Sequence, residues 1–184
     1  MRHLLLTLIV FLSALSSIDA RAAWMQNKTA PSFVKYDTLA YDSLRNGTYY
    51  FDDVFDTVKL DSGYYDLPRD GEMERDPYYV QFSKCVWGDL DGDGNSDAIV
   101  VLQAMEGGTG FFNYLFPVLN RHGRAHPLPG LEIGDRIDIL SIKIRNRIVI
   151  VDLITQGPND PRCCPTQEVV WRFRFDGSKL VKLK

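Results

Sequence analysis

Short runs of aromatic and β-branched residues, separated by clusters of turn residues, fill the sequence from residue 48 to its end. Runs of this length and composition are typical of β-strands, and the clusters between them are typical of tight connections. No segment in this region has the long hydrophobic period of an amphipathic helix. The pattern predicts an antiparallel all-β sandwich or barrel of about seven to eight strands, with at most a short helix near its N-terminal end.

Two hairpins stand out in the second half of the chain. "AIVVLQAM" and "FFNYLFPVL" flank the Gly-rich stretch "EGGTG", and "RIDILSIKI" and "RIVIVDLIT" flank Arg145-Asn146. In the third of these runs the alternation of apolar and polar residues slips between Ile139 and Ile142. We therefore expect two antiparallel pairs, with a β-bulge in the strand that contains the slip.

The two ends of the predicted domain carry weaker signals. Residues 36–47 contain two spaced leucines and then Asn46-Gly47, which is consistent with one or two helical turns that stop there. Near the other end, "VVWRFRF" alternates aromatic and basic residues. This period of two places Trp171, Phe173 and Phe175 on one face of a strand and the arginines on the other.

The first 22 residues resemble a secretory signal peptide. A short basic start precedes an apolar run over residues 4–15, and small residues follow around Ala20-Arg21-Ala22. The run is shorter than the roughly 20 residues that span a bilayer, which argues against an uncleaved anchor or a buried helix. Cleavage is expected after Ala22, with Ala20 as the second choice. The mature protein is then exported, either periplasmic or extracellular, with no membrane span.

The remaining residues divide into two predicted regions. Residues 23–35 are polar and contain proline, so we expect a flexible lead-in. Residues 36–184 are predicted to form a single all-β domain. The chain has 21 basic and 24 acidic residues, a net charge of -3, which argues against nucleic acid as a partner. Its densest basic stretch, "RHGRAHP", is short and is best explained as a solvated turn.

An acidic loop is the most distinctive motif. "DLDGDGNSDAIV" matches EF-hand loop positions 1, 3, 5, 7 and 9 with a set of oxygen ligands, the seventh through its backbone carbonyl: Asp89, Asp91, Asp93, Asn95 and Asp97. Position 12 is Val100, so the bidentate glutamate is missing, and the flanking segments are predicted strands. The motif therefore predicts a calcium loop between two strands.

The charges of this loop support a metal ion. Its four carboxylates repel one another, and no lysine or arginine occurs between Lys84 and Arg121. A calcium ion would neutralise them, with a dissociation constant on the order of 0.1 to 1 mM because the twelfth ligand is absent. We expect a structural and not a catalytic ion. The alternative is a metal-free turn whose aspartates accept hydrogen bonds from their own backbone.

The motif resembles the Asp-x-Asp-Gly-Asp-Gly-x-x-Asp loops found between strands in FG-GAP and VCBS-type repeats. Those families stack several such loops and this chain has one, so a propeller is not implied. The order of "GDLDGDGNSDAIVVL", "GGTGFF", "GDRIDI" and "PRCCPTQ" is similar to a group of small exported bacterial proteins of unknown function. That resemblance covers roughly residues 87–175 and implies the five calcium ligands, but no activity.

The chain contains three cysteines: Cys85, Cys163 and Cys164. In an oxidising compartment we expect Cys85 to pair with one of the other two, since closing a loop of about 80 residues stabilises a fold by about 4 kcal/mol. The alternative is a bond between the two neighbours, which closes a small strained ring.

Two classes of function follow from these features. The favoured hypothesis is a non-enzymatic, calcium-binding or calcium-stabilised binding or structural protein, whose partner is an envelope protein or a polysaccharide. The competing hypothesis is an envelope enzyme or thiol-redox protein that uses Cys163 and Cys164, with Arg162 favouring a thiolate and His122 or His126 as a base. No catalytic residue is assigned.

Overall fold

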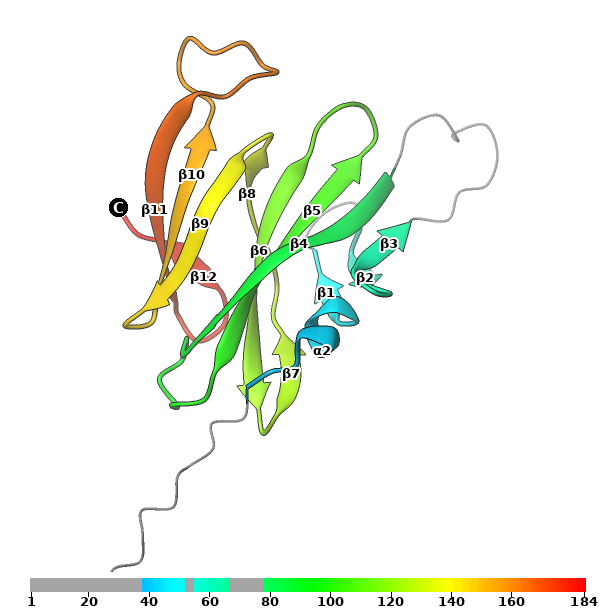
Figure 1. Ribbon diagram of the computed structural model, residues 1–184, viewed down its shortest axis with the longest axis vertical. Coiled ribbons are helices and arrows are strands. Elements are labelled where there is room, and N and C mark those ends of the chain that lie inside the picture. Colours follow the sequence, from blue (N-terminus) through cyan, green and yellow to red (C-terminus); the bar gives the residue numbers. More distant parts are fainter. Residues whose placement is uncertain (1–37, 52–54, 67–77) are drawn as a thin grey trace, which may run out of the picture. The chain divides into compact units, whose positions relative to one another are not determined.

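The computed structural model describes residues 38–51, 55–66 and 78–184 (Figure 1). By its internal contacts the chain divides into residues Met1–Lys35 and Tyr36–Lys184, and the described residues all belong to the second unit. The predicted signal peptide (1–22) and lead-in (23–35) lie outside the described residues. No helix within the described ranges is long and apolar enough to cross a membrane.

The described part of the chain is nearly all β-structure, with one short helix, α2 (Tyr41–Arg45), and twelve strands. A small hairpin pairs β1 (Thr48–Tyr50) with β2 (Thr57–Lys59). A six-stranded sheet has the order β3-β4-β5-β6-β7, with β8 also paired to β6: β3 (Tyr64–Asp66), β4 (Tyr78–Gly88), β5 (Asp97–Glu106), β6 (Phe112–Arg121), β7 (Arg124–Pro127) and β8 (Leu131–Asp135). A four-stranded sheet has the order β12-β11-β10-β9: β9 (Asp138–Arg145), β10 (Ile148–Thr155), β11 (Gln167–Phe175) and β12 (Leu180–Lys182).

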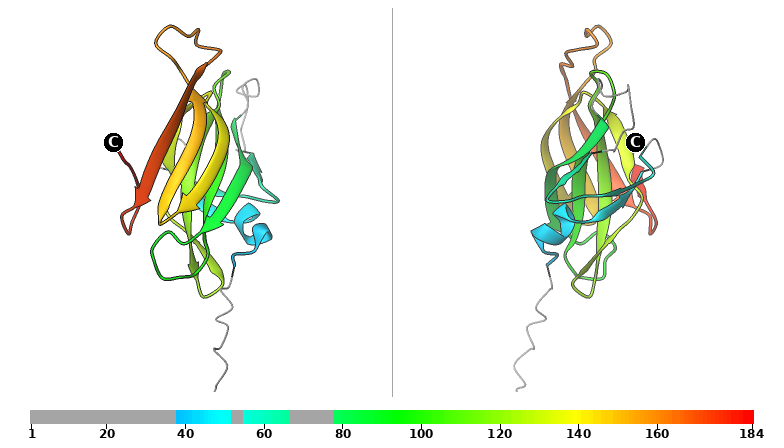
Figure 2. Two further views of the ribbon diagram at one scale, coloured as in Figure 1. Left: turned by 60° about the vertical axis from the view of Figure 1, so that its left-hand side comes forward. Right: turned by 90° about the vertical axis from the view of Figure 1, so that its right-hand side faces the viewer.

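The two larger sheets are open and packed face to face, which makes the domain a sandwich and confirms the predicted all-β class. The four-stranded sheet covers one face of the six-stranded sheet, and the β1-β2 hairpin with α2 covers the other (Figures 1 and 2). The sheets meet where β4 contacts β9. There a Cβ atom on Gly88 would lie 2.8 Å from that of Ile144, so this approach requires glycine.

The β5 strand is buried on both faces. Its even-numbered residues, Ala98, Val100, Leu102 and Ala104, belong to the core under the β1-β2 hairpin. Its odd-numbered residues Ile99 and Val101 belong to the core between the two large sheets. Because successive side chains in a strand point to opposite faces, the uninterrupted apolar stretch over residues 98–102 serves two cores at once.

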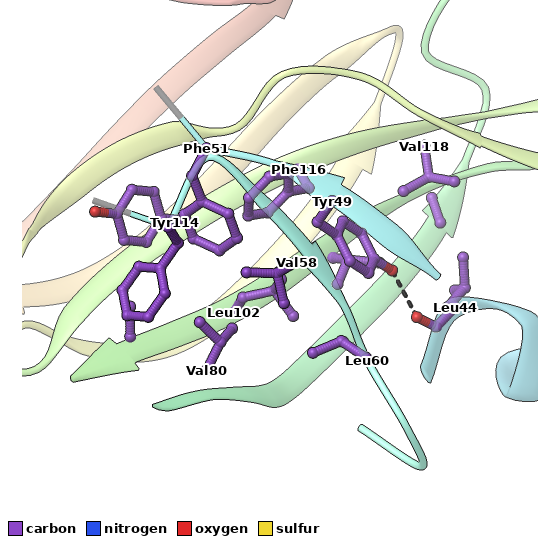
Figure 3. Packing of buried hydrophobic residues seen from close by; sticks show 14 of the residues in the cluster. Leu44, Tyr49, Phe51, Val58, Leu60, Val80, Leu102, Tyr114, Phe116 and Val118 are labelled. Carbon is purple, nitrogen blue, oxygen red and sulfur yellow. Dashed lines mark hydrogen bonds between the residues drawn. The ribbon is translucent and has the colours of Figure 1, made fainter. Parts of the chain in front are cut away.

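The core under the hairpin is rich in aromatic rings (Figure 3). The Phe116 ring on β6 lies 5.0 Å from the Tyr49 ring and 4.9 Å from the Phe51 ring, both in edge contacts. Tyr49 is fully buried, and its hydroxyl donates a 2.6 Å hydrogen bond to the Leu44 carbonyl at the end of α2. Burial raises the pKa of Tyr49 far above its usual value, so the phenol stays protonated. The ring therefore ties α2 to the sheet.

Pro117 lies in the middle of β6, where a strand normally needs every backbone donor. Two short strands pair with the same edge of β6 on either side of this proline. β8 pairs with β6 as far as Leu115, and β7 pairs with it from Val118 onward. The carbonyl of Pro117 accepts a hydrogen bond from the Leu128 amide in the connection between them. The missing donor thus falls in the gap between two short strands.

The local predictions agree well with the strands. Both expected hairpins form, as β5-β6 and β9-β10, and the pairing of β9 with β10 shifts register next to Leu153, which confirms the bulge. The turn Asn146-Arg147 adopts positive φ values of 51° and 62°. The strands number more than expected, because several are only three to five residues long.

We predict that Phe116→Ala destabilises the domain by about 3 to 5 kcal/mol, since the ring fills the centre of the hairpin core. Val181→Ala on the exposed edge should change the free energy of unfolding by less than about 0.5 kcal/mol. Urea denaturation of both variants measures the difference. Equal effects would contradict a core centred on Phe116.

Candidate functional site

The acidic loop, residues 89–96, joins β4 to β5 at one end of the sandwich. Gly88 and Asp97 face each other across the last rung of the ladder, so the two strands hold the loop at both ends. Within it Gly92 and Gly94 have φ values of 90° and 83°, which residues with a Cβ atom rarely adopt. These two glycines let the chain curl around its own carboxylates.

Asp97 anchors the loop through buried hydrogen bonds. It is fully buried, and its two carboxylate oxygens each accept a 2.8 Å hydrogen bond, one from the Leu90 amide and one from the Asn120 amide. The first bond closes the loop, and the second connects it to the end of β6. Burial raises the pKa of Asp97, and the two hydrogen bonds oppose that rise.

Two neighbours complete this anchor. Leu90 has an exposed fraction of only 1% and packs into the core between the two large sheets. The Asn120 side chain is also buried; it accepts a 2.7 Å bond from the Gly123 amide and donates one of 3.2 Å to the Ser96 carbonyl. The loop is therefore held by core packing and by buried hydrogen bonds, and not only by its own turns.

Three of the five predicted ligands come together. Asp89, Asp91 and Asp97 each offer one oxygen, and these oxygens lie within 4.8 Å of one another. Two oxygens bound to the same calcium ion at about 2.4 Å are at most about 4.8 Å apart, so the three residues fit a shared calcium ion. Hard oxygen donors of this kind are the ligands that calcium prefers.

The other two predicted ligands interact with each other. Asp93 accepts hydrogen bonds from the backbone and side-chain nitrogens of Asn95, at 2.8 and 2.9 Å. These bonds, with the backbone bond the larger effect, lower the pKa of Asp93. Asp93 and Asn95 thus shape the outer part of the loop in this structure.

The loop also contains the bonds expected of a metal-free turn. One oxygen of Asp89 accepts a 2.6 Å hydrogen bond from the Gly92 amide, and one of Asp91 accepts a 3.1 Å bond from the Asp93 amide. Such bonds stabilise the loop shape without an ion. Each carboxylate keeps lone pairs for a cation, so the two arrangements are compatible.

The fold supplies cations that the local sequence lacks. Arg121, at the end of β6, places one guanidinium nitrogen 2.9 Å from Asp91 and 3.5 Å from Asp93. Arg147, from the β9-β10 turn, lies so near that a Cβ atom on Gly92 would be 2.9 Å from its Nη1. The acidic loop is therefore partly neutralised by arginine, which the absence of nearby basic residues in the sequence did not suggest.

Sequence reasoning missed Asn120 and Arg121 as partners of the loop. Both follow directly on the apolar run of β6, where a strand end is expected. Nothing local showed that this end lies beside residues more than 20 positions earlier, because that proximity depends on the β5-β6 register.

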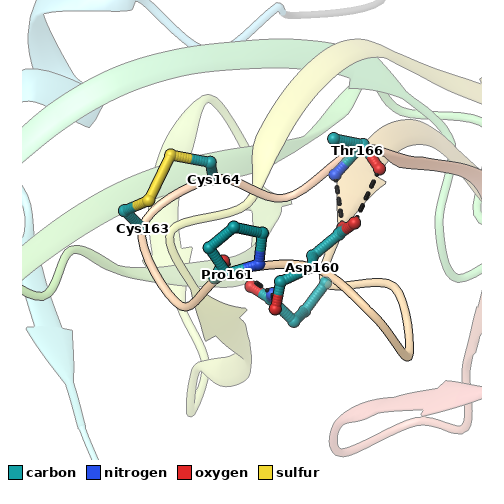
Figure 4. Close-up of a disulfide and its surroundings, with 6 residues drawn as sticks. Asp160, Pro161, Cys163, Cys164 and Thr166 are labelled. Carbon is teal, nitrogen blue, oxygen red and sulfur yellow. Dashed lines mark hydrogen bonds between the residues drawn. A yellow bond between two sulfur atoms is a disulfide. The ribbon is translucent and has the colours of Figure 1, made fainter.

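The preferred cysteine pairing is wrong. Cys163 and Cys164 are bonded to each other in the loop between β10 and β11 (Figure 4). Cys85 is a free thiol. Cys85 lies on β4 and packs against the hairpin core, whereas β10 and β11 cover the opposite face of the same sheet. The six-stranded sheet thus separates it from the other two. Burial raises the pKa of Cys85 to about 11, which keeps it a thiol at neutral pH.

Asp160 organises the loop that carries the disulfide. Its carboxylate accepts bonds of 2.7 Å from the Thr166 amide and 2.8 Å from the Thr166 hydroxyl (Figure 4). It also accepts a bond of 2.8 Å from the Gly157 amide. These bonds, led by that from Gly157, lower the pKa of Asp160. The two cysteines are exposed at the tip of a loop with defined hydrogen bonds.

The histidines proposed as a base lie far from the cysteines. Cys163 lines a shallow hollow with Thr109 and Phe111, next to the β5-β6 turn at the start of β6. His122 follows the other end of β6, which has ten residues and is therefore ~30 Å long. His126 pairs with Leu119 near that same end of β6, so neither His122 nor His126 reaches the disulfide to form a Cys-His pair.

Comparisons of the chain with protein-family models, with curated proteins and with solved structures found no match.

We predict that Asp97→Asn destabilises the domain by about 1 to 3 kcal/mol in the presence of a chelator. An amide has one acceptor oxygen, so one of the buried amides of Leu90 and Asn120 would lose its partner. The matched control is Asp138→Asn, at an exposed strand position. Chemical denaturation that shows the same small effect for both variants would contradict an anchoring role for Asp97.

Proposed function

We propose that this protein is an exported, non-enzymatic binding or structural protein. Calcium bound by its β4-β5 loop stabilises the fold. The observation that supports calcium most strongly is the gathering of oxygens from Asp89, Asp91 and Asp97 within 4.8 Å. Asp97 is held by two buried backbone donors, so the site is preorganised on one side. The predicted signal peptide and the disulfide both support an oxidising, extracytoplasmic location.

Calcium in this loop would have a structural role. The loop ends are fixed in β4 and β5, and Asp97 also contacts the end of β6. An ion bound by these residues connects three neighbouring strand ends. Arg121 competes for Asp91, and the twelfth-position glutamate is absent, so the affinity should be in the weak range of extracellular modules, on the order of 0.1 to 1 mM.

We predict that saturating calcium raises the melting temperature and that a chelator lowers it again. At a concentration 100 times the dissociation constant, one bound ion stabilises by about 2.7 kcal/mol. Asp89→Asn should abolish the shift, because it removes a ligand without removing the Asp91 ion pair. Asp138→Asn serves as the control and should keep it. If calcium leaves the melting temperature of the wild-type protein unchanged, the proposal is wrong.

A thiol-redox role is the second candidate, and one observation favours it. The Cys163–Cys164 bond is exposed, beside Arg162, on a loop that Asp160 holds in place. A nearby cation favours the thiolate that attacks or leaves in disulfide exchange. Such a role needs no histidine and no calcium.

We predict one free thiol per chain in denaturant without reductant, and three after reduction. The single thiol should be Cys85, which should react slowly in the native protein because its pKa is about 11. Thiol titration with mass spectrometry measures both counts. A redox role further requires Cys163–Cys164 to equilibrate with glutathione buffers; a pair that stays oxidised in all of them contradicts it.

A further inference from the structure

The outward face of the four-stranded sheet carries basic side chains at one end. On β11 the residues Phe173 and Phe175 point into the core, so Arg172 and Arg174 point outward. The register extends this pattern across three strands in two adjacent rows: Lys143, Ile150 and Arg172 in one, and Arg145, Ile148 and Arg174 in the other. We call the four basic residues of these rows, together with Arg147 of the β9-β10 turn, the basic face.

Most of these charges lack partners. Among the residues that the structure describes, Arg145, Arg147 and Arg174 form no side-chain hydrogen bond or ion pair. Lys143 lies 3.6 Å from Asp152, and that carboxylate also attracts Arg172. The four basic side chains of the two rows share one carboxylate, that of Asp152, so they repel one another, and an anionic partner would relieve that repulsion.

A hollow next to the basic face could hold part of a ligand. Its volume is about 500 Å³, and its lining includes the two arginines Arg147 and Arg174 and the two carboxylates Asp91 and Asp176. It lies between the β9-β10 turn, the end of β11 and the acidic loop. A ligand that follows the basic rows would reach this hollow without leaving the sheet.

The side chains of the basic face limit the chemistry of the partner. Guanidinium groups bind carboxylates and phosphates through paired, parallel hydrogen bonds, so an anionic partner of either kind suits them. The outward positions of β9, β10 and β11 carry no aromatic side chain, because the aromatic residues of β11 face inward. A stacking platform for bases or for uncharged sugar rings is therefore absent from this part of the described surface. The partner has to be recognised through its charges.

The opposite end of the same sheet face argues against a flat anionic partner. It carries Asp138 on β9 and Glu168 on β11, which both pair with Ile154 of β10. An anionic membrane lying flat on the sheet would contact these acidic groups as well as the basic ones, and the acidic groups would repel it. A linear polymer can cross the basic rows alone, where adjacent strands lie ~4.8 Å apart.

We infer that the basic face binds a linear acidic polysaccharide through its carboxylate groups. The inference rests on the proposed binding role and names the class of partner. It does not require calcium, because the arginines supply the contacts.

Binding of polygalacturonate, a carboxylated glycan, to the full chain tests the inference by calorimetry in a chelating buffer, with neutral dextran as the control polymer. We expect binding that weakens with salt, and a loss of about tenfold in affinity for the double variant Arg172→Gln/Arg174→Gln. Arg162→Gln, which removes an exposed charge at the other end of β10 and β11, should bind like the wild type. Lys143→Gln/Arg145→Gln should reproduce the loss from the far side of the rows, which guards against a folding defect in the first variant.

The outcomes separate this inference from the proposed function. If the wild type binds and neither double variant weakens that binding, the basic face is not the binding site. The proposed binding role would be unaffected by that result. Absence of binding to polygalacturonate, or tighter binding to a single-stranded oligonucleotide or to anionic vesicles, would overturn the acidic polysaccharide as the partner. The calcium-dependent melting shift is measured separately and is unaffected by either result.

Discussion

The burial of β5 and β6 on both faces is the constraint on which the rest of the domain depends. Their alternate side chains enter two cores, so the six-stranded sheet can exist only if both faces are covered. The four-stranded sheet covers one face, and the β1-β2 hairpin with α2 covers the other. Asp97 begins β5, and its carboxylate is buried because the strand that carries it enters the core at its first residue.

The strands, the two long hairpins and the bulge were predictable because they depend on neighbouring residues. "AIVVL" also indicated a buried strand, but not what covers each face, since that is decided by segments far along the chain. The same limit explains the cysteines: loop closure favours a distant pair, yet it ignores that Cys85 lies on the far side of a sheet from Cys163. In the acidic loop the types of ligand could be predicted from the sequence. The contacts of Arg121 and Asn120 with the loop could not, because they depend on the strand register.

Charge in this domain is separated over short distances. The chain has a net charge of -3, yet its outer sheet gathers basic residues on alternate positions of β9 and β11. Arg147 and Asp91 line the same hollow, so the acidic loop and the basic face share a border. The sign of the local potential thus changes across one turn of the chain. A partner's orientation can be set by this contrast even where individual exposed pairs contribute little.

The bond between Cys163 and Cys164 joins adjacent residues, and Cys85 is free. None of the three cysteines therefore forms a disulfide between distant segments of the chain. Under a pulling force every strand can be drawn out in turn, and the contour reaches its full ~3.3 to 3.6 Å per residue with no length hidden inside a closed loop. Resistance to mechanical extension then comes from the strand ladders and the packed layers alone.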